Sequence, residues 1–273
     1  MLRSMYAGVS GMKGFQTKLD VIGNNIANVN TVGYKKSTIN FQDLLSQNLS
    51  SGGVNPMQVG LGSSTSAINV VHTPGSFMTT GVGTDLSING DGFFIVQKPL
   101  AAPGVDQYLT RAGNFVVNSD GNLVTTQGYN VLDNGGRPIK VNSLTTGTPP
   151  TTINFDSFSI NRLGEVIGKE ANGTETRITT IGIAQPENPA GLQKFGGSLY
   201  ELTSKADSRT LAQITGTPNA MNTEIASGML EMSNVDLTEE FTEMIIAQRG
   251  FQANSRIITT SDEVLQEVVN LKR

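Results

Sequence analysis

Residues that could carry chemistry are scarce in this sequence, which contains one histidine, His72, and no cysteine. Thiol chemistry, disulfide scaffolds and zinc-finger frameworks are therefore excluded. A Ser-His-Asp mechanism would require His72 as its base. His72 lies before a proline in the segment NVVHTPG, and a lone histidine in such a loop is typical of a packed or solvated side chain rather than a ligand.

Two segments resemble ligand-binding loops without completing them. The segment GVGTDLSINGDG, residues 81–92, has neither the GK[ST] ending of a phosphate-binding loop nor the G-x-G-x-x-G spacing. The segment NSDGN, residues 118–122, begins like a calcium loop, but no glutamate stands at the twelfth position. The carboxylates of the central region mostly lie beside Gly or Asn, as in turns, and none is singled out as a glycosidase pair. We therefore expect no enzymatic activity, catalytic residue, cofactor or metal.

The composition excludes further classes of protein. The chain has 273 residues, of which 15% are charged, with a formal net charge of -4. This balance argues against a general nucleic-acid-binding protein. No stretch approaches the roughly 18 consecutive apolar residues that a membrane-spanning helix needs, so no membrane insertion is expected. The N-terminus lacks a compact apolar segment and a small-residue cleavage site, and we expect no cleaved signal peptide.

Apolar residues at both ends of the chain recur at the spacing of an amphipathic helix. Between residues 5 and 26, steps of three and four alternate after a first step of seven, as in a heptad seam. A similar stripe runs through the last 38 residues, where Asp236 and Glu239 have the spacing of a capping box before a helix over residues 237–272. The predicted self-assembly seam comprises Met5, Met12, Phe15, Leu19, Ile22, Ile26, Phe241, Met244, Phe251, Ile258, Leu265 and Val269.

Glycines and charges suggest what these terminal helices need. Gly8, Gly11, Gly14 and Gly23 lie within the first helix, and each costs about 1 kcal/mol relative to alanine, so this helix requires a closely packed partner. Residues 1–36 carry five basic side chains and one acidic one, whereas residues 231–273 carry eight acidic and four basic ones. The two ends are therefore complementary in charge as well as in amphipathic character.

The middle of the chain, from about residue 80 to 230, predicts antiparallel β-structure. Short runs rich in β-branched and aromatic residues, such as FFIVQ and NFVVN, alternate with turn signals such as Asp91-Gly92 and Asp120-Gly121. No helical periodicity separates these runs, which favours a sandwich or barrel-like domain. The predicted fold class is therefore α+β, with long N- and C-terminal helices and an antiparallel all-β domain between them.

Two terminal segments resemble the signatures of the flagellar rod and hook axial proteins. LDVIGNNIANVNTVGYKK, residues 19–36, resembles the N-terminal signature, and residues 228–273 resemble the C-terminal one. The central segments INGDGFFIV, YLTRAGNF and DGNLVTTQGYNVL also match, so the resemblance covers nearly the whole chain. The residues of the family motif are Asn24, Asn25, Ala27, Asn28, Gly33, Ser233, Asn234, Val235 and Asp236.

The resemblance implies a subunit of a helical tube. It assigns residues 1–36 and 231–273 to a coiled-coil-like inner domain, residues 37–79 to an extended linker, and residues 80–230 to an outer β domain. Within the family, the resemblance favours the hook subunit in its short Gram-positive form, a flexible curved tube that transmits motor torque from rod to filament as a universal joint. The distal rod subunit is the alternative, and a β-rich surface enzyme or adhesin with helical ends is a third possibility.

The family also implies the partners and the location of the protein. The partners would be further copies of the same chain, the distal rod protein, the hook cap, the hook-filament junction protein and the flagellar type III export apparatus. The protein would reach the hook or basal body outside the cell without a cleaved signal peptide.

Overall fold

The computed structural model describes residues 2–50, 57–99, 106–146, 151–170 and 172–271. The chain divides into two compact units. Unit 1 consists of Met1–Val29, Lys36–Val71 and Val235–Arg273, and unit 2 consists of Asn30–Lys35 and His72–Asn234. No helix of the described residues carries an apolar stretch long enough to cross a membrane.

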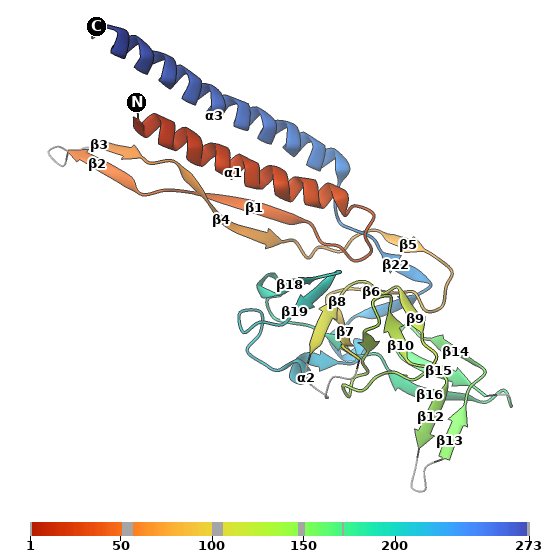
Figure 1. Ribbon diagram of the computed structural model, residues 1–273. Helices are drawn as coiled ribbons and strands as arrows, with labels where there is room; N and C mark the ends of the chain where they lie inside the picture. The colour runs from red at the N-terminus through yellow and green to blue at the C-terminus, as the bar shows by residue number, and fades with distance from the viewer. Residues whose placement is uncertain (1, 51–56, 100–105, 147–150, 171, 272–273) are drawn as a thin grey trace. The chain divides into compact units, whose positions relative to one another are not determined.

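Unit 1 is built around two long helices that lie side by side and run antiparallel (Figure 1). Helix α1 spans Leu2–Ala27 and helix α3 spans Leu237–Leu271, so a long helix occupies each predicted helical segment. The other elements of unit 1 are β1 (Ser37–Asp43), β2 (Ser46–Ser50), β3 (Met57–Gly60) and β4 (Ser63–Val70). Strand β1 pairs antiparallel with β4, β2 pairs with β3, and both β1 and β4 contact α1.

The start of α3 is held by the side chain predicted to cap it. One carboxylate oxygen of Asp236 accepts hydrogen bonds from the backbone N–H groups of Thr238, at 2.8 Å, and Glu239, at 3.4 Å. These donors satisfy the first free N–H groups of the helix and lower the pKa of Asp236. The Glu239 side chain turns away to pair with Lys36, at 2.8 Å.

Glycines allow α1 and α3 to approach closely. A Cβ atom on Gly11 would lie 3.0 Å from the Asn254 side chain, and one on Gly250 would lie 2.5 Å from the Phe15 ring. Gly14 faces β1, where a Cβ would come within 3.0 Å of Phe41. The partner required by the glycine-rich first helix is thus α3 together with β1.

Unit 2 contains the remaining strands, and all of their pairings are antiparallel. The largest sheet has the order β18-β19-β8-β7-β11-β10-β9, with β17 paired to β7 and β20 paired to β17. Strands β14, β15 and β16 form a second sheet, and β12–β13, β21–β6 and β22–β5 form two-stranded ones. The predicted α+β class is therefore confirmed.

The strands of unit 2 have the following bounds: β5 (Phe77–Thr79), β6 (Leu86–Asn89), β7 (Phe93–Gln97), β8 (Gln107–Thr110), β9 (Phe115–Val117), β10 (Leu123–Thr125), β11 (Asn130–Val131), β12 (Ser143–Thr146), β13 (Thr151–Asn154), β14 (Ser157–Ile160), β15 (Glu165–Lys169), β16 (Glu175–Thr180), β17 (Ile183–Ala184), β18 (Gln193–Gly196), β19 (Leu199–Glu201), β20 (Thr215–Gly216), β21 (Glu224–Ser227) and β22 (Met229–Glu231). Helix α2 spans Leu211–Ile214, and single 3₁₀ turns span Pro189–Gly191 and Pro218–Met221.

The hydrophobic core of unit 2 forms around β7, in which all five residues are buried. The rings of Phe94 and Phe115 meet edge to face with their centroids 5.1 Å apart. Leu86 and Ile183 from neighbouring strands close the same cluster. A central strand buried on both faces is apolar without alternation, which matches the run FFIVQ.

Candidate functional site

The surface between α1 and α3 is formed by facing positions along both helices. Asn25 of α1 contacts Glu240 of α3, Lys18 contacts Glu243, and Gly8 lies against Ile258. Glu240 and Ala247, seven residues apart, are the buried residues among the described side chains of α3. The face of α3 turned toward α1 therefore runs about one residue before the stripe predicted from the sequence.

The predicted seam divides into covered and uncovered residues. In α1, Ile22 is buried, and Met5, Met12, Phe15, Leu19 and Ile26 are half-buried. In α3, Met244, Ile258 and Leu265 are half-buried. Phe241, Phe251 and Val269 are 50%, 37% and 65% exposed. The structure thus brings nine of the twelve residues into partly or fully covered positions, and the role of all twelve in self-assembly stays a prediction.

Asn25 ties the end of α1 to both of its neighbours in unit 1. Its amide exchanges two hydrogen bonds with the backbone of Ser37, at 2.9 and 3.0 Å, as a paired strand would. It also donates to a carboxylate oxygen of Glu240 at 3.1 Å. Burial raises the pKa of Glu240, and the hydrogen bond from Asn25 acts in the opposite direction. This contact gives the motif residue Asn25 a defined structural role.

Ion pairs across unit 1 follow the charge pattern of the sequence. Lys18 pairs with Glu243 at 2.5 Å, and Lys36 pairs with Glu239 at 2.8 Å. Both acidic partners are substantially exposed, so each pair contributes about 0–1 kcal/mol. These pairs set the register of the two terminal segments more than they stabilise them.

The rest of α3 presents large apolar side chains to solvent. These side chains, each at least 37% exposed, recur along the length of the helix, and exposed apolar surface of this kind marks an interaction site. The exposed apolar residues of α3 are Leu237, Phe241, Ile245, Ile246, Phe251, Ile257, Val264, Val268, Val269 and Leu271. We call this set the uncovered α3 surface.

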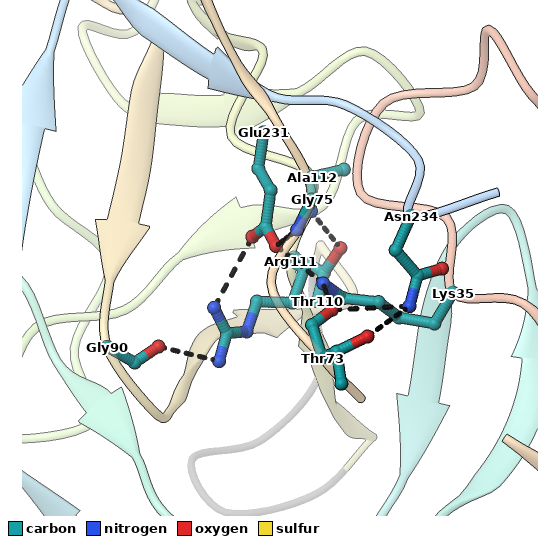
Figure 2. A network of polar contacts seen from close by, with 9 residues as sticks. All are labelled: Lys35, Thr73, Gly75, Gly90, Thr110, Arg111, Ala112, Glu231 and Asn234. Atoms are coloured by element: carbon teal, nitrogen blue, oxygen red, sulfur yellow. Dashed lines mark hydrogen bonds and ion pairs between the residues drawn. The ribbon is translucent and has the colours of Figure 1, made fainter. Parts of the chain in front are cut away.

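A second candidate site lies within unit 2, where a charged cluster is buried around Glu231 (Figure 2). One oxygen of the Glu231 carboxylate accepts from the Lys35 ammonium group at 2.5 Å and from the Gly75 N–H at 3.0 Å. The other oxygen accepts from Arg111 at 3.3 Å. Arg111 also donates to the Gly90 carbonyl at 2.9 Å. The side chains of Lys35 and Glu231 are fully buried, and that of Arg111 is 4% exposed.

This cluster holds two cations and one anion away from water. Buried charges are tolerated only where they are paired and hydrogen-bonded. The Glu231 carboxylate pairs with both cations and accepts a hydrogen bond from each of them. Burial lowers the pKa of Lys35, and its hydrogen bond to Glu231 opposes that change. The removal of Glu231 would leave two buried positive charges without a counter-charge, whereas the removal of Lys35 would leave a matched pair.

Two further motif residues join the same cluster. Asn234 donates to the side-chain oxygen of Thr73 at 2.9 Å and to its carbonyl at 3.3 Å, and Lys35 donates to that carbonyl at 2.7 Å (Figure 2). Gly33 has a φ of +68°, and a Cβ there would lie 2.5 Å from the backbone nitrogen of Ala112. Only glycine fits such a position.

The other motif residues lie at or beside the ends of the long helices. Asn28 donates to the carbonyl and side-chain oxygens of Asn24, both at 2.9 Å, as α1 ends. Ala27 is the exposed last residue of α1. Ser233 is half-buried, and Val235 is buried just before the capping residue Asp236. The motif residues therefore lie at the ends of the long helices or take part in the buried cluster.

His72 packs between aromatic rings rather than beside a nucleophile. Its ring meets those of Phe93 and Tyr200 at centroid distances of 5.6 and 5.5 Å. Burial lowers its pKa to about 4, with Lys35, Arg111 and Lys194 adding repulsion, while the Pro189 carbonyl acts weakly in the other direction. Among the described residues, no group of three or more His, Asp or Glu side chains is placed to hold a metal ion.

Sequence reasoning missed Lys35, Arg111 and Glu231 as a unit. Periodicity assigns charged residues to the surface, and nothing in their spacing, at positions 35, 111 and 231, links them. The available signal was their occurrence inside or beside the segments that resemble the family, namely NTVGYKK, YLTRAGNF and GMLEMSN.

Three family descriptions match the chain. "Flagella basal body rod protein" matches residues 5–35, "Flagellar hook protein FlgE/F/G D1 domain" matches residues 87–168, and "Flagellar basal body rod FlgEFG protein C-terminal" matches residues 226–271. The three ranges include both long helices and much of the β-structure.

Curated relatives extend this match to the full length. The flagellar basal-body rod protein FlgG of Bacillus subtilis is 48% identical over 281 residues, covering 100% of both chains. FlgG of Agrobacterium fabrum is 37% identical over 284 residues, covering 99% of this chain and 100% of the relative. The flagellar hook protein FlgE of Borreliella burgdorferi is 28% identical over 449 residues, covering 100% of both.

Among solved structures, the flagellar hook protein FlgE2 of Helicobacter pylori shares 26% sequence identity with this chain. That match covers 32% of this chain and 24% of the other, and its TM-score of 0.22 is too low to indicate a common fold.

Proposed function

Because this chain belongs to the flagellar rod and hook protein family, which places it among structural proteins of the flagellum and not among enzymes, we propose that it is a subunit of the distal rod. The observation that carries this choice is the 48% identity to a rod protein over the whole length of both chains. The hook subunit favoured by the sequence resemblance is less well supported, since the hook relative is 28% identical.

Chain length supports the same choice. The alignment with the Bacillus rod protein spans 281 positions, close to the 273 residues of this chain. The alignment with the Borreliella hook protein spans 449 positions, so that relative contains long segments without a counterpart here. A chain that needs few gaps to match rod proteins from end to end fits a rod subunit better than a hook subunit.

The uncovered α3 surface supports assembly into a polymer. A soluble monomer rarely exposes a long row of large apolar side chains, because water contact with apolar surface is unfavourable by about 25 cal/mol per Å². In α3 such residues extend from Leu237 to Leu271, along the whole helix. We expect neighbouring copies of the same chain to cover this surface.

Close packing within unit 1 suits a stiff rod. The glycines at positions 8, 11 and 250 bring two long helices into direct contact, and β1 and β4 pack along α1. Close packing between elements resists deformation. We therefore infer a straight tube whose wall is built from paired terminal helices, with other axial flagellar proteins as neighbours at its ends. Its delivery by the flagellar type III export apparatus, without a cleaved signal peptide, remains an expectation from the family.

Electron microscopy of basal bodies from a deletion strain tests this proposal. We expect basal bodies that lack the distal rod and therefore also lack every part beyond it. Re-expression of the chain should restore a straight segment. Basal bodies that keep a complete rod and lack only a curved hook would overturn the rod assignment in favour of the hook.

A purified polymer offers a second test with an independent readout. A rod subunit should form short straight tubes at high protein concentration, and variants with charges on the uncovered α3 surface should remain monomeric. Curved tubes of variable length would instead identify a hook subunit.

A further inference from the structure

The chain passes between the two units four times, after residues 29, 35, 71 and 234. Between the first two crossings lie six residues, Asn30–Lys35, which belong to unit 2. The chain reaches them shortly after the end of α1 and returns to unit 1 at residue 36. We call residues 30–35 the anchor segment. We propose that the anchor segment fastens the N-terminal helix to the β unit, with Glu231 as its attachment point.

Every residue from 32 to 35 is held by unit 2. The Val32 carbonyl accepts from the Ser198 hydroxyl at 3.3 Å, and the Gly33 N–H donates to the Glu231 carbonyl at 2.8 Å. The ammonium group of Lys194 lies 4.7 Å from the centroid of the Tyr34 ring. Lys35 is bound by the Glu231 carboxylate.

Glu231 holds the anchor segment by its backbone and its side chain together. Its carbonyl accepts from Gly33, its carboxylate accepts from Lys35, and both contacts belong to one residue of β22. Charge-assisted hydrogen bonds away from water are the strongest of their kind. The buried ion pair thus attaches the short segment more firmly than its few apolar side chains could.

The same cluster ties together three of the four crossings. Lys35 precedes the second crossing, Thr73 follows the third, and Asn234 precedes the fourth. The Thr73 carbonyl accepts from both Lys35 and Asn234, so this one acceptor joins three connecting segments (Figure 2). A force applied to any one of these segments is therefore transmitted to the other two and to β22.

This arrangement has a mechanical consequence that rests on the proposed function. A rod subunit must transmit torque between its helical and β units without the connecting segments detaching from the β unit. Segments that are bonded to one another share the applied force, whereas unconnected segments would detach one after another. Glu231 and Lys35 act here as positioning residues.

Hydrogen exchange on the isolated full-length chain tests the attachment without reference to the flagellum. In the Lys35→Met variant the Glu231–Arg111 pair remains matched, so the β unit should keep its fold. We expect exchange in residues 30–35 to accelerate about tenfold or more, because loss of a charged hydrogen bond populates the detached segment. Exchange in β7 should stay unchanged.

A steric variant gives an independent route to the same result. Gly33→Ala places a Cβ against the Ala112 backbone and should detach the segment while leaving the Glu231–Arg111 pair intact. Glu239→Gln removes only the exposed partner of Lys36 and should leave exchange in residues 30–35 unaltered. The matched glycine control is Gly23→Ala, where no atom lies within 4 Å of the added Cβ.

Two outcomes of the exchange experiment would overturn the proposal. Exchange in residues 30–35 that stays within twofold of the parent chain in both Lys35→Met and Gly33→Ala would overturn the proposal. Equal acceleration throughout unit 2 would also overturn it, since the cluster would then be part of the general fold. Cells carrying a confirmed detaching variant should swim normally in dilute medium and fail at high viscosity, and normal swimming there would refute the mechanical role alone.

Discussion

The two units cover their apolar side chains to different degrees. Unit 2 buries a complete apolar core around β7 and also buries an ion cluster. Unit 1 exposes Phe241 and Ile245 of α3 to 50% and 59%, and its ion pairs lie at the surface. A core closed within one chain is stable alone, whereas a helix with exposed apolar faces becomes fully covered only among neighbours. Unit 2 therefore closes its core within one chain, whereas we expect neighbouring copies to cover the exposed apolar side chains of unit 1.

The largest effect is expected where the closed core is opened. Phe94→Ala removes a fully buried ring that packs on Phe115, and it should lower the free energy of unfolding by about 3–5 kcal/mol. Val116→Ala, on the exposed side of β9, should change it by less than about 0.5 kcal/mol. Urea unfolding followed by circular dichroism measures both, and similar values for the two variants would show that unit 2 lacks the closed core described here.

A smaller effect is expected where the helices of unit 1 touch. Gly250→Ala pushes a methyl group into the Phe15 ring and should cost about 1–3 kcal/mol by separating α1 from α3. Gly23→Ala meets no neighbouring atom and should instead stabilise α1 by up to about 1 kcal/mol. Hydrogen exchange in α1 reports both changes. If Gly250→Ala protects α1 as well as Gly23→Ala does, the helices are not in contact at this position.

The pH dependence of stability should sharpen the contrast further, because the single histidine lies in unit 2. The unfolded chain protonates His72 near its ordinary pKa of 6.5, whereas the folded protein resists protonation until about pH 4. Between these values the unfolded state binds more protons, so the free energy of unfolding falls as the pH is lowered, with a slope of at most one proton. Below about pH 4 this contribution levels off.

Replacement of the histidine isolates that contribution. His72→Phe retains an aromatic ring beside Phe93 and Tyr200, and it should flatten the dependence between pH 6.5 and 4 while the carboxylates titrate as before. Urea unfolding at a series of pH values gives the two slopes. Identical slopes in the parent and the variant would mean that His72 protonates as readily in the folded protein as in the unfolded chain.

The smallest effect on the monomer should come from the uncovered α3 surface. Phe241→Ser and Ile245→Ser should each change the free energy of unfolding by less than about 0.5 kcal/mol, because both side chains already contact water. The same variants should abolish tube formation in sedimentation experiments, whereas Gln248→Ser on the same helix should still assemble. Assembly that survives both apolar replacements would exclude this part of α3 from the interface between copies.

Local patterns in the sequence were sufficient for much of the fold. The 3,4 spacing of apolar residues predicted both long helices, and Asp236 predicted where the second one begins. The run FFIVQ coincides with β7, and turn signals such as Asp120-Gly121 lie between paired strands. These features depend on residues close together in the chain, which is the range over which periodicity and turn chemistry operate.

Orientation was harder to predict than structure type. The predicted seam of the second helix contains Phe241 and Phe251, yet the structure turns the neighbouring stripe of Glu240 and Ala247 toward α1. A helix with apolar residues on several faces gives no signal for which face meets which partner. Complementary charges were a better guide, since Lys18 and Lys36 do pair with acidic residues of α3.

The sequence by itself determined the class of the protein: helical ends that require a partner and an antiparallel β middle. Only the tertiary structure brought Lys35, Arg111 and Glu231 into one buried cluster and returned residues 30–35 to the β unit. The physical reason is that hydrophobic periodicity is a property of neighbouring residues. The burial of a charge depends instead on whether a counter-charge arrives from a distant part of the chain, and only the folded backbone decides that.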